Sequence, residues 1–300
     1  MTVGRFAPTP SGRMHLGNVF AAMLAWLSVR SQNGTMVLRM EDLDTQRAKA
    51  EYAQTLRDDL SWLGLDWDLE TPPQSQRSAV YDRYFDILKS KGLLYPCYCT
   101  RAQLHSVNAP HLSDGTYIYP GTCRNLTQPP KARTPAWRVT VPDQAWVVED
   151  LVQGTYTENL AADCGDFVVR RSDGFYVYQL AVTVDDGEAG VTEVVRGTDL
   201  LSSAPRQMYL QSLFGFQHPR YAHVPLLVAP DGRRLSKRDR DMDLGYLRQH
   251  TTPEKLLGTL AHACGLIPTN APVSACGLIS EFDWQKVHKG AICLDFQDLL

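Results

Sequence analysis

Long hydrophobic runs are missing from this sequence. No apolar stretch approaches the roughly 20 residues that a membrane-spanning helix needs, although 44% of the 300 residues are hydrophobic. The amino-terminal residues also lack the basic and then apolar arrangement of a signal peptide. These two absences predict a cytoplasmic protein that does not associate with a membrane.

The sequence also has neither an even set of cysteines nor an excess of positive charge. Its seven cysteines are an odd number and are unevenly spaced, which argues against a disulfide framework. The formal net charge is −3 at pH 7, so overall charge gives no sign of nucleic-acid binding. A nucleic acid would have to be held by local basic patches. Candidates are Lys131/Arg133/Arg138, Arg170/Arg171 and Arg233 to Arg240.

The first third of the chain alternates strand-like and helix-like segments. Residues 2–7 indicate a buried strand, residues 15–31 have apolar side chains at helical spacing, and residues 35–40 indicate a second strand. Parallel strands joined by a helix require a right-handed crossover. Further helices are predicted over residues 45–63 and 78–91. This pattern is typical of half of a doubly wound sheet.

Later segments are shorter and more varied. Residues 166–184 alternate like a β-hairpin closed at Asp173–Gly174, and residues 203–214 show helical spacing. Residues 223–229 form an apolar strand that precedes a turn and a basic loop, and the remainder is mostly helical.

A turn rich in glycine and proline, residues 8–12, leads toward the start of the first helix. A helix N-terminus offers unpaired N–H groups and a partial positive charge, which suit a phosphate. His15 and Asn18 are three residues apart and can direct donors at the same phosphate, while Gly12 and Gly17 let a ligand approach the backbone. On its own, this segment is equally compatible with an ordinary turn before a helix.

The basic loop far downstream contains Lys237. A lysine on such a loop would neutralise the charge of a departing pyrophosphate, and electrostatic stabilisation dominates phosphoryl and nucleotidyl transfer. Alone, the loop is equally compatible with a solvated surface. Together with the first segment, it predicts a site that binds ATP and cleaves it between the α- and β-phosphates.

Both segments resemble signatures of the class I aminoacyl-tRNA synthetases. The run Pro8-Thr9-Pro10-Ser11-Gly12-Arg13-Met14-His15-Leu16-Gly17-Asn18 is similar to the first signature, in the form used by the glutamyl/glutaminyl branch. The run Arg234-Leu235-Ser236-Lys237-Arg238 is similar to the second, lysine-bearing signature. Segments 166–186 and 195–200 between them also resemble this branch. The resemblance covers about residues 1–250.

The resemblance implies an enzyme that uses ATP with Mg²⁺ to activate an amino acid as its adenylate. It implies His15, Asn18 and Lys237 as catalytic residues. The full set implied for ATP binding is Pro8, Gly12, His15, Gly17, Asn18, Arg234, Leu235, Ser236, Lys237 and Arg238.

The resemblance also implies an α/β fold with a Rossmann-like, doubly wound parallel sheet. Residues 1–94 and 166–235 would be the two halves of the catalytic domain. Residues 95–165, with short strand-like pieces and scattered prolines, would be an inserted zinc-binding α+β domain. Residues 236–300 would hold the signature loop and a small helical region.

Glutamate is the amino acid that the resemblance implies. Glutamate has two carboxylates and one ammonium, so its pocket needs arginines and an acid, and arginine–carboxylate contacts are strong. Glu41 would meet the ammonium. The glutamate-binding residues would be Arg5, Phe6, Ala7, Pro8, Thr9, Glu41, Tyr178 and Arg196. Without the resemblance, Glu41 and Arg196 would be interpreted as surface residues.

The chain departs from the ordinary members of this branch at two points. It has Val182 where they carry an asparagine, and only about 60 residues follow Lys237, too few for their anticodon-reading helical domains. Both features resemble a truncated paralogue that activates L-glutamate without tRNA and places it on queuosine in the anticodon of tRNA(Asp). The alternatives are an ordinary glutamyl-tRNA synthetase that charges the 3′ end of tRNA(Glu) and a catalytically silent adenylate-binding module. Nothing in the sequence demands more than a monomer.

Three cysteines, Cys97, Cys99 and Cys123, lie within 27 residues. Three thiolates suit a structural Zn²⁺, which takes four ligands. Candidates for the fourth ligand are His105, His111, Tyr117 and Tyr119, of which spacing alone favours a histidine. The family pattern, Cys-x-Cys followed by Tyr-x-x-x-Cys, instead implies Tyr119. The alternative is three unliganded thiols. The other cysteines are isolated: Cys164, Cys264, Cys276 and Cys293.

Overall fold

The largest element of the fold is a seven-stranded sheet with the strand order β3-β2-β1-β9-β10-β6-β7. The computed structural model describes residues 1–106, 118–128, 130, 133–233 and 243–299. Its neighbouring strands run parallel except for the antiparallel pair β6 and β7. The strands are β1 (Val3–Phe6), β2 (Thr35–Leu38), β3 (Leu69–Glu70), β6 (Ala145–Asp150), β7 (Gly154–Asn159), β9 (Glu193–Gly197) and β10 (Arg220–Val224). The prediction of a mostly parallel sheet is therefore confirmed.

Helices cover both faces of this sheet. Neighbouring residues of a strand point to opposite faces, and in β9 Val194 packs in one hydrophobic cluster while Val195 packs in another. The cluster that holds Val195 includes most of α1 (Leu16–Ser31). The cluster that holds Val194 includes Ala204 of α6 (Ser203–Phe214). Both faces are thus buried, as is usual for a parallel sheet.

Helix α1 lies close against β1 because of a glycine. A Cβ atom at Gly4 would sit 2.3 Å from a methyl group of Val29, far inside van der Waals contact. Eleven of the 16 residues of α1 are buried. This burial holds α1 against the sheet, and the helix begins directly after the turn that follows β1.

Helix α2 (Ala50–Leu63) begins later than the predicted residue 45. The backbone N–H of Lys49 donates to the carbonyl of Pro10 at 3.0 Å, and that of Ala48 donates to Asp44 at 2.9 Å. The chain before Ala50 is thus tied to the turn that follows β1. It forms turns there rather than a helical face.

A second sheet contains β4 (Leu94–Cys97), β5 (Ala136–Val139) and β8 (Phe167–Arg170), all antiparallel. It packs with α3 (Ser78–Ser90) and α5 (Tyr178–Glu188). Strand pairing crosses the predicted domain limits, since β6 and β7 belong to the large sheet and β8 to the small one. The limits themselves stay a prediction.

The predicted hairpin over residues 166–184 is wrong in its second half. Strand β8 and the turn at Asp173–Gly174 are present, but residues from Tyr178 form helix α5. Seven consecutive residues of this helix, 180–186, are buried. Periodicity alone does not distinguish such a short buried run in a helix from one in a strand.

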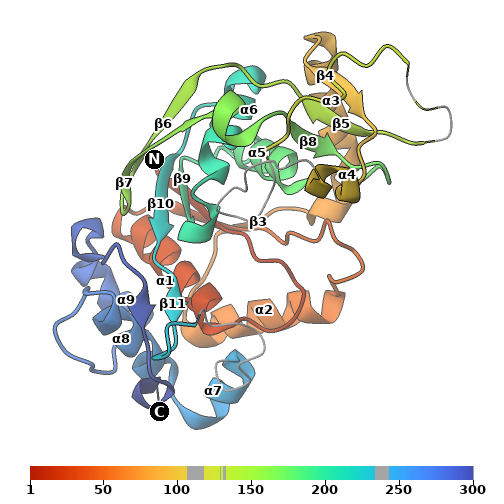
Figure 1. The fold of residues 1–300 in the computed structure, drawn as a ribbon. Helices are drawn as coiled ribbons and strands as arrows, with labels where there is room; N and C mark the ends of the chain where they lie inside the picture. Colours follow the sequence, from red (N-terminus) through yellow and green to blue (C-terminus); the bar gives the residue numbers. More distant parts are fainter. Residues whose placement is uncertain (107–117, 129, 131–132, 234–242, 300) are drawn as a thin grey trace.

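The carboxyl-terminal part is mostly helical. Figure 1 shows these helices, in blue, at the opposite end of the molecule from the yellow β4–α4–β5 segment. Helix α4 spans Arg101–Ser106, and the carboxyl-terminal elements are β11 (Leu227–Val228), α7 (Leu244–His250), α8 (Pro253–Ala263), α9 (Ala275–Leu278) and β12 (Ile292–Cys293).

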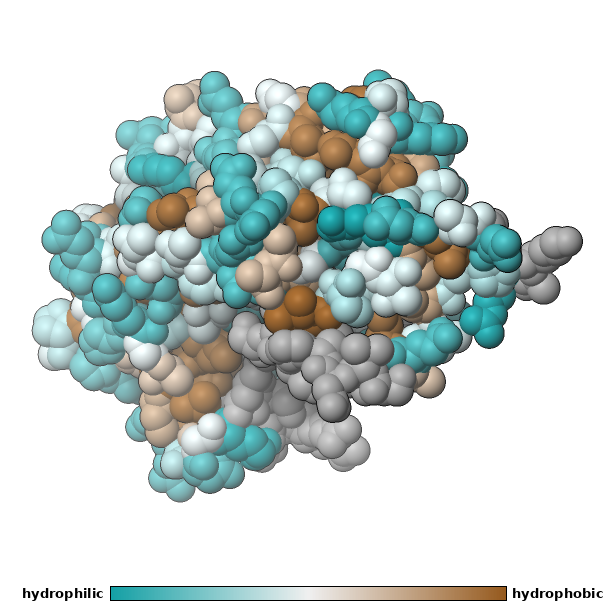
Figure 2. Space-filling model, turned by 45° about the horizontal axis from the view of Figure 1, so that its top comes forward, coloured by the Kyte–Doolittle hydropathy of each residue, from teal (hydrophilic) through white to brown (hydrophobic). Residues whose placement is uncertain are grey.

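Among the described residues, no helix combines the length and the apolar character required to cross a membrane. On the face drawn in Figure 2, hydrophobic side chains form patches that are separated by hydrophilic ones.

Candidate active site

A cavity of about 390 Å³ opens where β1, β9 and β10 end at their carboxyl termini. Strands β1 and β9 are neighbours in the sheet although far apart in the chain. From β1 the strand order continues to β2 and β3 on one side, and from β9 it continues to β10 on the other, so the direction of the strand order reverses between β1 and β9. Open α/β sheets bind ligands at such a switch point. The cavity therefore lies where the fold itself favours a ligand.

The residues predicted for glutamate and for ATP meet at this cavity. Its lining includes all eight predicted glutamate residues, Arg5, Phe6, Ala7, Pro8, Thr9, Glu41, Tyr178 and Arg196. It also includes the described residues predicted for ATP, which are Pro8, Gly12, His15, Gly17 and Asn18. The remaining predicted ATP residues, Arg234, Leu235, Ser236, Lys237 and Arg238, lie outside the described residues.

The first signature shapes the entrance to α1. Gly12 has φ +147°, which L side chains rarely adopt, so a glycine suits this turn. His15 is the N-cap, and its backbone N–H donates to Oδ1 of Asn18 at 3.3 Å. A Cβ atom on Gly17 would lie 3.1 Å from the His15 ring. The N-terminal N–H groups of α1 thus lie beside the cavity, with little side-chain bulk over them.

The chain on either side of residues 234–242 is fixed near the cavity. Leu227 lines the cavity, and the turn that follows is closed by a 2.9 Å hydrogen bond from the N–H of Ala229 to the carbonyl of Arg233. On the other side, Asp243 forms a β-bridge with His15, and the N–H of Leu244 donates to Met14 at 3.1 Å.

Buried charges on one side of the cavity neutralise each other. Arg39 is fully buried, and its guanidinium donates to Asp186 at 2.6 Å and to Glu41 at 3.1 Å. Arg5 donates to the carbonyl of Val195 at 2.9 Å, and its Nε lies 3.5 Å from Asp186. Burial opposes the ionisation of Asp186, but Arg39 and Arg5 outweigh it and hold the pKa of Asp186 below its ordinary value.

The positive charges near Glu41 do not fully offset the effect of its burial. Burial raises the pKa of Glu41, and the nearby Arg39 and Arg5 offset only part of this rise. A ligand ammonium beside Glu41 would lower that pKa again. The carboxylate is therefore suited to a cationic partner that arrives with the ligand.

Arg196 is held on three sides. Its Nε donates to Nε2 of His223 at 3.0 Å, and its Nη1 donates to Oε1 of Gln207 at 2.8 Å. The hydroxyl of Tyr178 lies 3.4 Å from the same Nη1. Nη2 is buried and has no hydrogen-bond partner among the described residues. A buried donor without a partner is costly, and a ligand carboxylate would satisfy it.

Sequence reasoning missed several residues that hold this site together. Arg39 and Asp186 fix the buried charges, and His223 with Asp150 fixes Arg196. The available signal was a charged or titratable residue inside an otherwise apolar strand or helix. The sequence pattern places His223 only in an apolar strand and indicates no role for Arg39.

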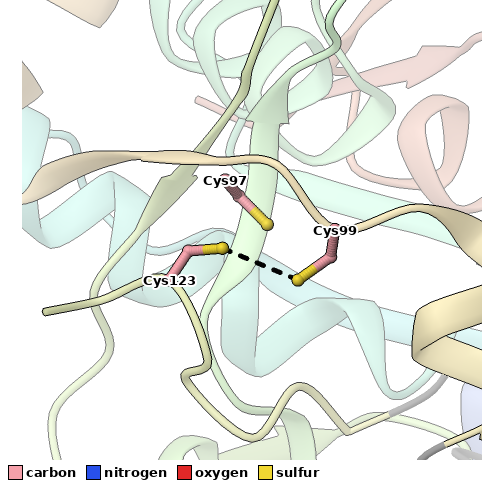
Figure 3. Close-up of side chains that lie close together, drawn as sticks. All are labelled: Cys97, Cys99 and Cys123. Atoms are coloured by element: carbon pink, nitrogen blue, oxygen red, sulfur yellow. Dashed lines mark hydrogen bonds between the residues drawn. The ribbon is translucent and has the colours of Figure 1, made fainter. Parts of the chain in front are cut away.

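The three cysteines and Tyr119 converge at the far end of the small sheet. Figure 3 shows the side chains of Cys97, Cys99 and Cys123 pointing toward one another. Their sulfur atoms all lie within 4.8 Å of one another, and Sγ of Cys99 lies 3.6 Å from Sγ of Cys123. The hydroxyl of Tyr119 lies 3.4 Å from Sγ of Cys97 and 3.7 Å from Sγ of Cys99.

These distances fit a tetrahedral zinc site. With Zn–S near 2.3 Å and Zn–O near 2.0 Å, tetrahedral ligands lie about 3.8 Å apart for two sulfurs and about 3.5 Å apart for sulfur and oxygen. Buried Arg138 donates to Sγ of Cys97 at 3.2 Å, and its guanidinium stands 3.6 Å from the centre of the Tyr119 ring. Its charge offsets the negative charge that three thiolates would carry.

Comparison with known proteins places the chain in a family. Residues 1–299 match the tRNA synthetases class I (E and Q), catalytic domain. A Glutamyl-Q tRNA(Asp) synthetase of Nitratidesulfovibrio vulgaris is 46% identical, over 93% of this chain and 92% of that protein. A Glutamyl-Q tRNA(Asp) synthetase of Symbiobacterium thermophilum is 44% identical, over 96% of this chain and 94% of that protein.

A solved structure is also similar. The crystal structure of a glutamate tRNA ligase from Elizabethkingia meningosepticum in complex with its amino acid has a TM-score of 0.85 and 27% identity. The match covers 99% of this chain and 68% of that one. The chain therefore belongs to the class I tRNA synthetases of the E and Q type, and it is an enzyme of the ligase class.

Proposed function

We propose that the protein activates L-glutamate with ATP in the absence of tRNA and transfers the glutamate to queuosine in the anticodon of tRNA(Asp). The observation that carries the proposal is one cavity that combines Arg5, Arg196 and Glu41 with the N-terminus of α1. Two relatives named for this activity match the chain over nearly their whole length.

Glutamate would be recognised by its charges. Arg196, with its unpartnered Nη2, and Arg5 would bind the carboxylates, while Glu41 would bind the ammonium. Tyr178 lines the same cavity, and its hydroxyl contacts Nη1 of Arg196. Phe6, Ala7, Pro8 and Thr9 continue the wall from β1 toward the ATP side.

ATP would lie along the start of α1. His15 and Asn18 would hold its phosphates together with the N–H groups of the helix N-terminus, and Pro8, Gly12 and Gly17 leave space for it. A glutamate α-carboxylate oxygen would attack the α-phosphorus, and the bond to the β-phosphate oxygen would break, which yields glutamyl-adenylate and pyrophosphate. Lys237, with its neighbours in Arg234–Arg238, would stabilise the leaving pyrophosphate. Mg²⁺ bound to ATP supplies charge neutralisation on the phosphates.

One structural Zn²⁺ would be held by Cys97, Cys99, Tyr119 and Cys123. The support is the tetrahedral fit of their sulfur and oxygen separations. The ion would stabilise an inserted α+β domain at about residues 95–165 without taking part in the chemistry.

Transfer of glutamate from the adenylate to queuosine would release AMP.

A second candidate function is that of an ordinary glutamyl-tRNA synthetase, which charges the 3′ end of tRNA(Glu). The TM-score of 0.85 with a glutamate tRNA ligase supports this candidate. It does not separate the two candidates, because the shared catalytic fold suits either reaction. The two candidates differ in the need for tRNA during activation and in the place where glutamate is attached.

Glutamate-dependent exchange between ATP and pyrophosphate, measured without tRNA, separates these possibilities. We expect exchange with L-glutamate alone. Exchange that appears only after tRNA is added would favour the ordinary synthetase, and no exchange under either condition would favour a silent adenylate-binding module.

A further inference from the structure

Behind the cavity, a chain of buried polar side chains runs from β6 through β10 to β9. It consists of Asp150, His223 and Arg196, which are 6%, 0% and 6% exposed. Buried parallel strands are normally apolar, and buried polar groups are costly unless every one is paired. Because burying these polar groups costs free energy, we expect them to serve a function.

The first link fixes the ionised state of Asp150. Its Oδ1 accepts hydrogen bonds from the backbone N–H groups of Val152 at 3.0 Å and Gln153 at 2.8 Å. Burial opposes its ionisation, but these bonds and the contact with His223 hold the pKa of Asp150 below its ordinary value. An ionised carboxylate only accepts hydrogen bonds, so Nδ1 of His223, 2.6 Å from Oδ2, must donate its proton to Asp150.

The second link follows from the first. With the proton on Nδ1, a neutral His223 presents a lone pair at Nε2. Nε of Arg196 lies 3.0 Å from that atom, and a guanidinium only donates. Both hydrogen bonds are satisfied by one tautomer alone, and the strand pairing of β10 with β6 and β9 places the three side chains in line.

The third link determines which part of Arg196 remains for a ligand. His223 occupies Nε and Gln207 occupies Nη1, so Nη2 is left without a partner among the residues that the structure describes. Arg196 lines the cavity. A long, flexible side chain is thereby held in one orientation before any ligand arrives, and such preorganisation strengthens binding.

We propose that His223, oriented by Asp150, is a positioning residue for amino-acid recognition: it holds Arg196 so that Nη2 binds a carboxylate of the ligand. The proposal rests on the proposed function, which makes glutamate that ligand. His223 does not line the cavity. It acts through Arg196, so its loss affects the amino acid and leaves ATP almost unchanged.

The test compares His223→Ala, His223→Gln and Asp150→Asn with the wild type. Glutamate and ATP affinities are measured separately by calorimetry, and the KM of each substrate is measured by pyrophosphate exchange. Loss of a hydrogen bond to a charged group weakens glutamate binding about tenfold or more in His223→Ala, while the KM for ATP changes less than about twofold on the same argument. His223→Gln recovers part of the loss, since its amide oxygen can accept from Nε of Arg196.

The matched control is His218→Gln. His218 is an exposed histidine that hydrogen-bonds Ser212 at 2.9 Å and does not line the cavity. It should leave both affinities unchanged. Nitrogen NMR of the wild-type imidazoles adds a measurement that needs no variant, and it should show His223 neutral with the proton on Nδ1.

Unchanged glutamate affinity in His223→Ala or in Asp150→Asn would overturn the inference. An equal loss for glutamate and ATP would do the same, because it would indicate a purely structural role. If neither variant folds, the NMR result decides, and a proton on Nε2 contradicts the proposal. A wild-type protein that binds no glutamate refutes the proposed function itself, which is a different result from any of these.

Discussion

The cavity and the cysteine cluster differ in the sequence separation of the residues that form them. The cavity combines positions as distant as Arg5 and Arg196, which become neighbours only when β1 pairs with β9. The cluster takes its sulfur and oxygen atoms from residues 97–123 alone. One site therefore depends on the whole sheet, whereas the other depends on a short segment.

The two sites also balance charge in different ways. In the cavity, Arg39 and Arg5 face Asp186 and Glu41 from within the protein. In the cluster, three thiols gather beside the single guanidinium of Arg138. The charges of the cavity are thus largely balanced before a ligand arrives, although Nη2 of Arg196 has no partner among the described residues, whereas a bound cation would complete the cluster.

Removal of the metal should affect the cluster and spare the cavity. Binding of a structural Zn²⁺ contributes on the order of 10 kcal/mol in small zinc domains. We expect about one zinc per chain by metal analysis, and a clearly lower melting temperature after treatment with a chelator. Glutamate binding should persist below that temperature.

Cys99→Ser should reproduce the loss of metal, while the matched control Cys276→Ser, at an exposed and isolated position, should retain it. Purified protein with an intact fold and no metal would remove the claim of a zinc site.

Lys237→Ala should abolish most of the chemistry and leave the fold unchanged. Loss of a charge that stabilises a transition state costs about 10²- to 10³-fold in rate. Pyrophosphate exchange is the measurement, and circular dichroism checks the fold. Lys286→Ala is the control, because Lys286 lies on the surface and pairs with Glu281. Near-normal exchange in Lys237→Ala would sink the assigned role.

Acid should destabilise the protein through His223. Burial lowers the pKa of His223 from 6.5 to about 4. Between these values the unfolded chain binds a proton that the folded chain refuses, so stability falls as the pH falls. The shift corresponds to a loss of about 3 kcal/mol from pH 7 to pH 4. Urea unfolding of the wild type and His223→Gln, at several pH values, measures this difference, and identical pH profiles for the two proteins would contradict it.

Several elements that the sequence predicts are present, and so is the cluster whose residues are close in the chain. Residues 203–214 form α6 as predicted, and the strand–helix–strand unit at the amino terminus is present. Cys97, Cys99 and Cys123 converge because they are near in the chain. The choice of Tyr119 over a histidine came from the resemblance, and its role as a ligand stays a prediction.

The sequence alone did not predict what depends on long-range contacts or on full burial. The sequence predicts a strand where helix α5 lies, because a short buried apolar run is compatible with either element. The partnership of His223 with Asp150 joins residues 73 positions apart, through strand pairing that no local pattern reveals. The glutamate residues come together at one cavity, but spacing did not show this, and the resemblance supplied them.

The measurement that tests the central claim most directly is the charging of tRNA(Asp) with labelled glutamate. Matched tRNA(Asp) preparations with and without queuosine are incubated with the enzyme and ATP, and nuclease digestion then locates the label. We expect label only in the preparation with queuosine, confined to the anticodon fragment. Label at the 3′ end, or label that does not depend on queuosine, would contradict it.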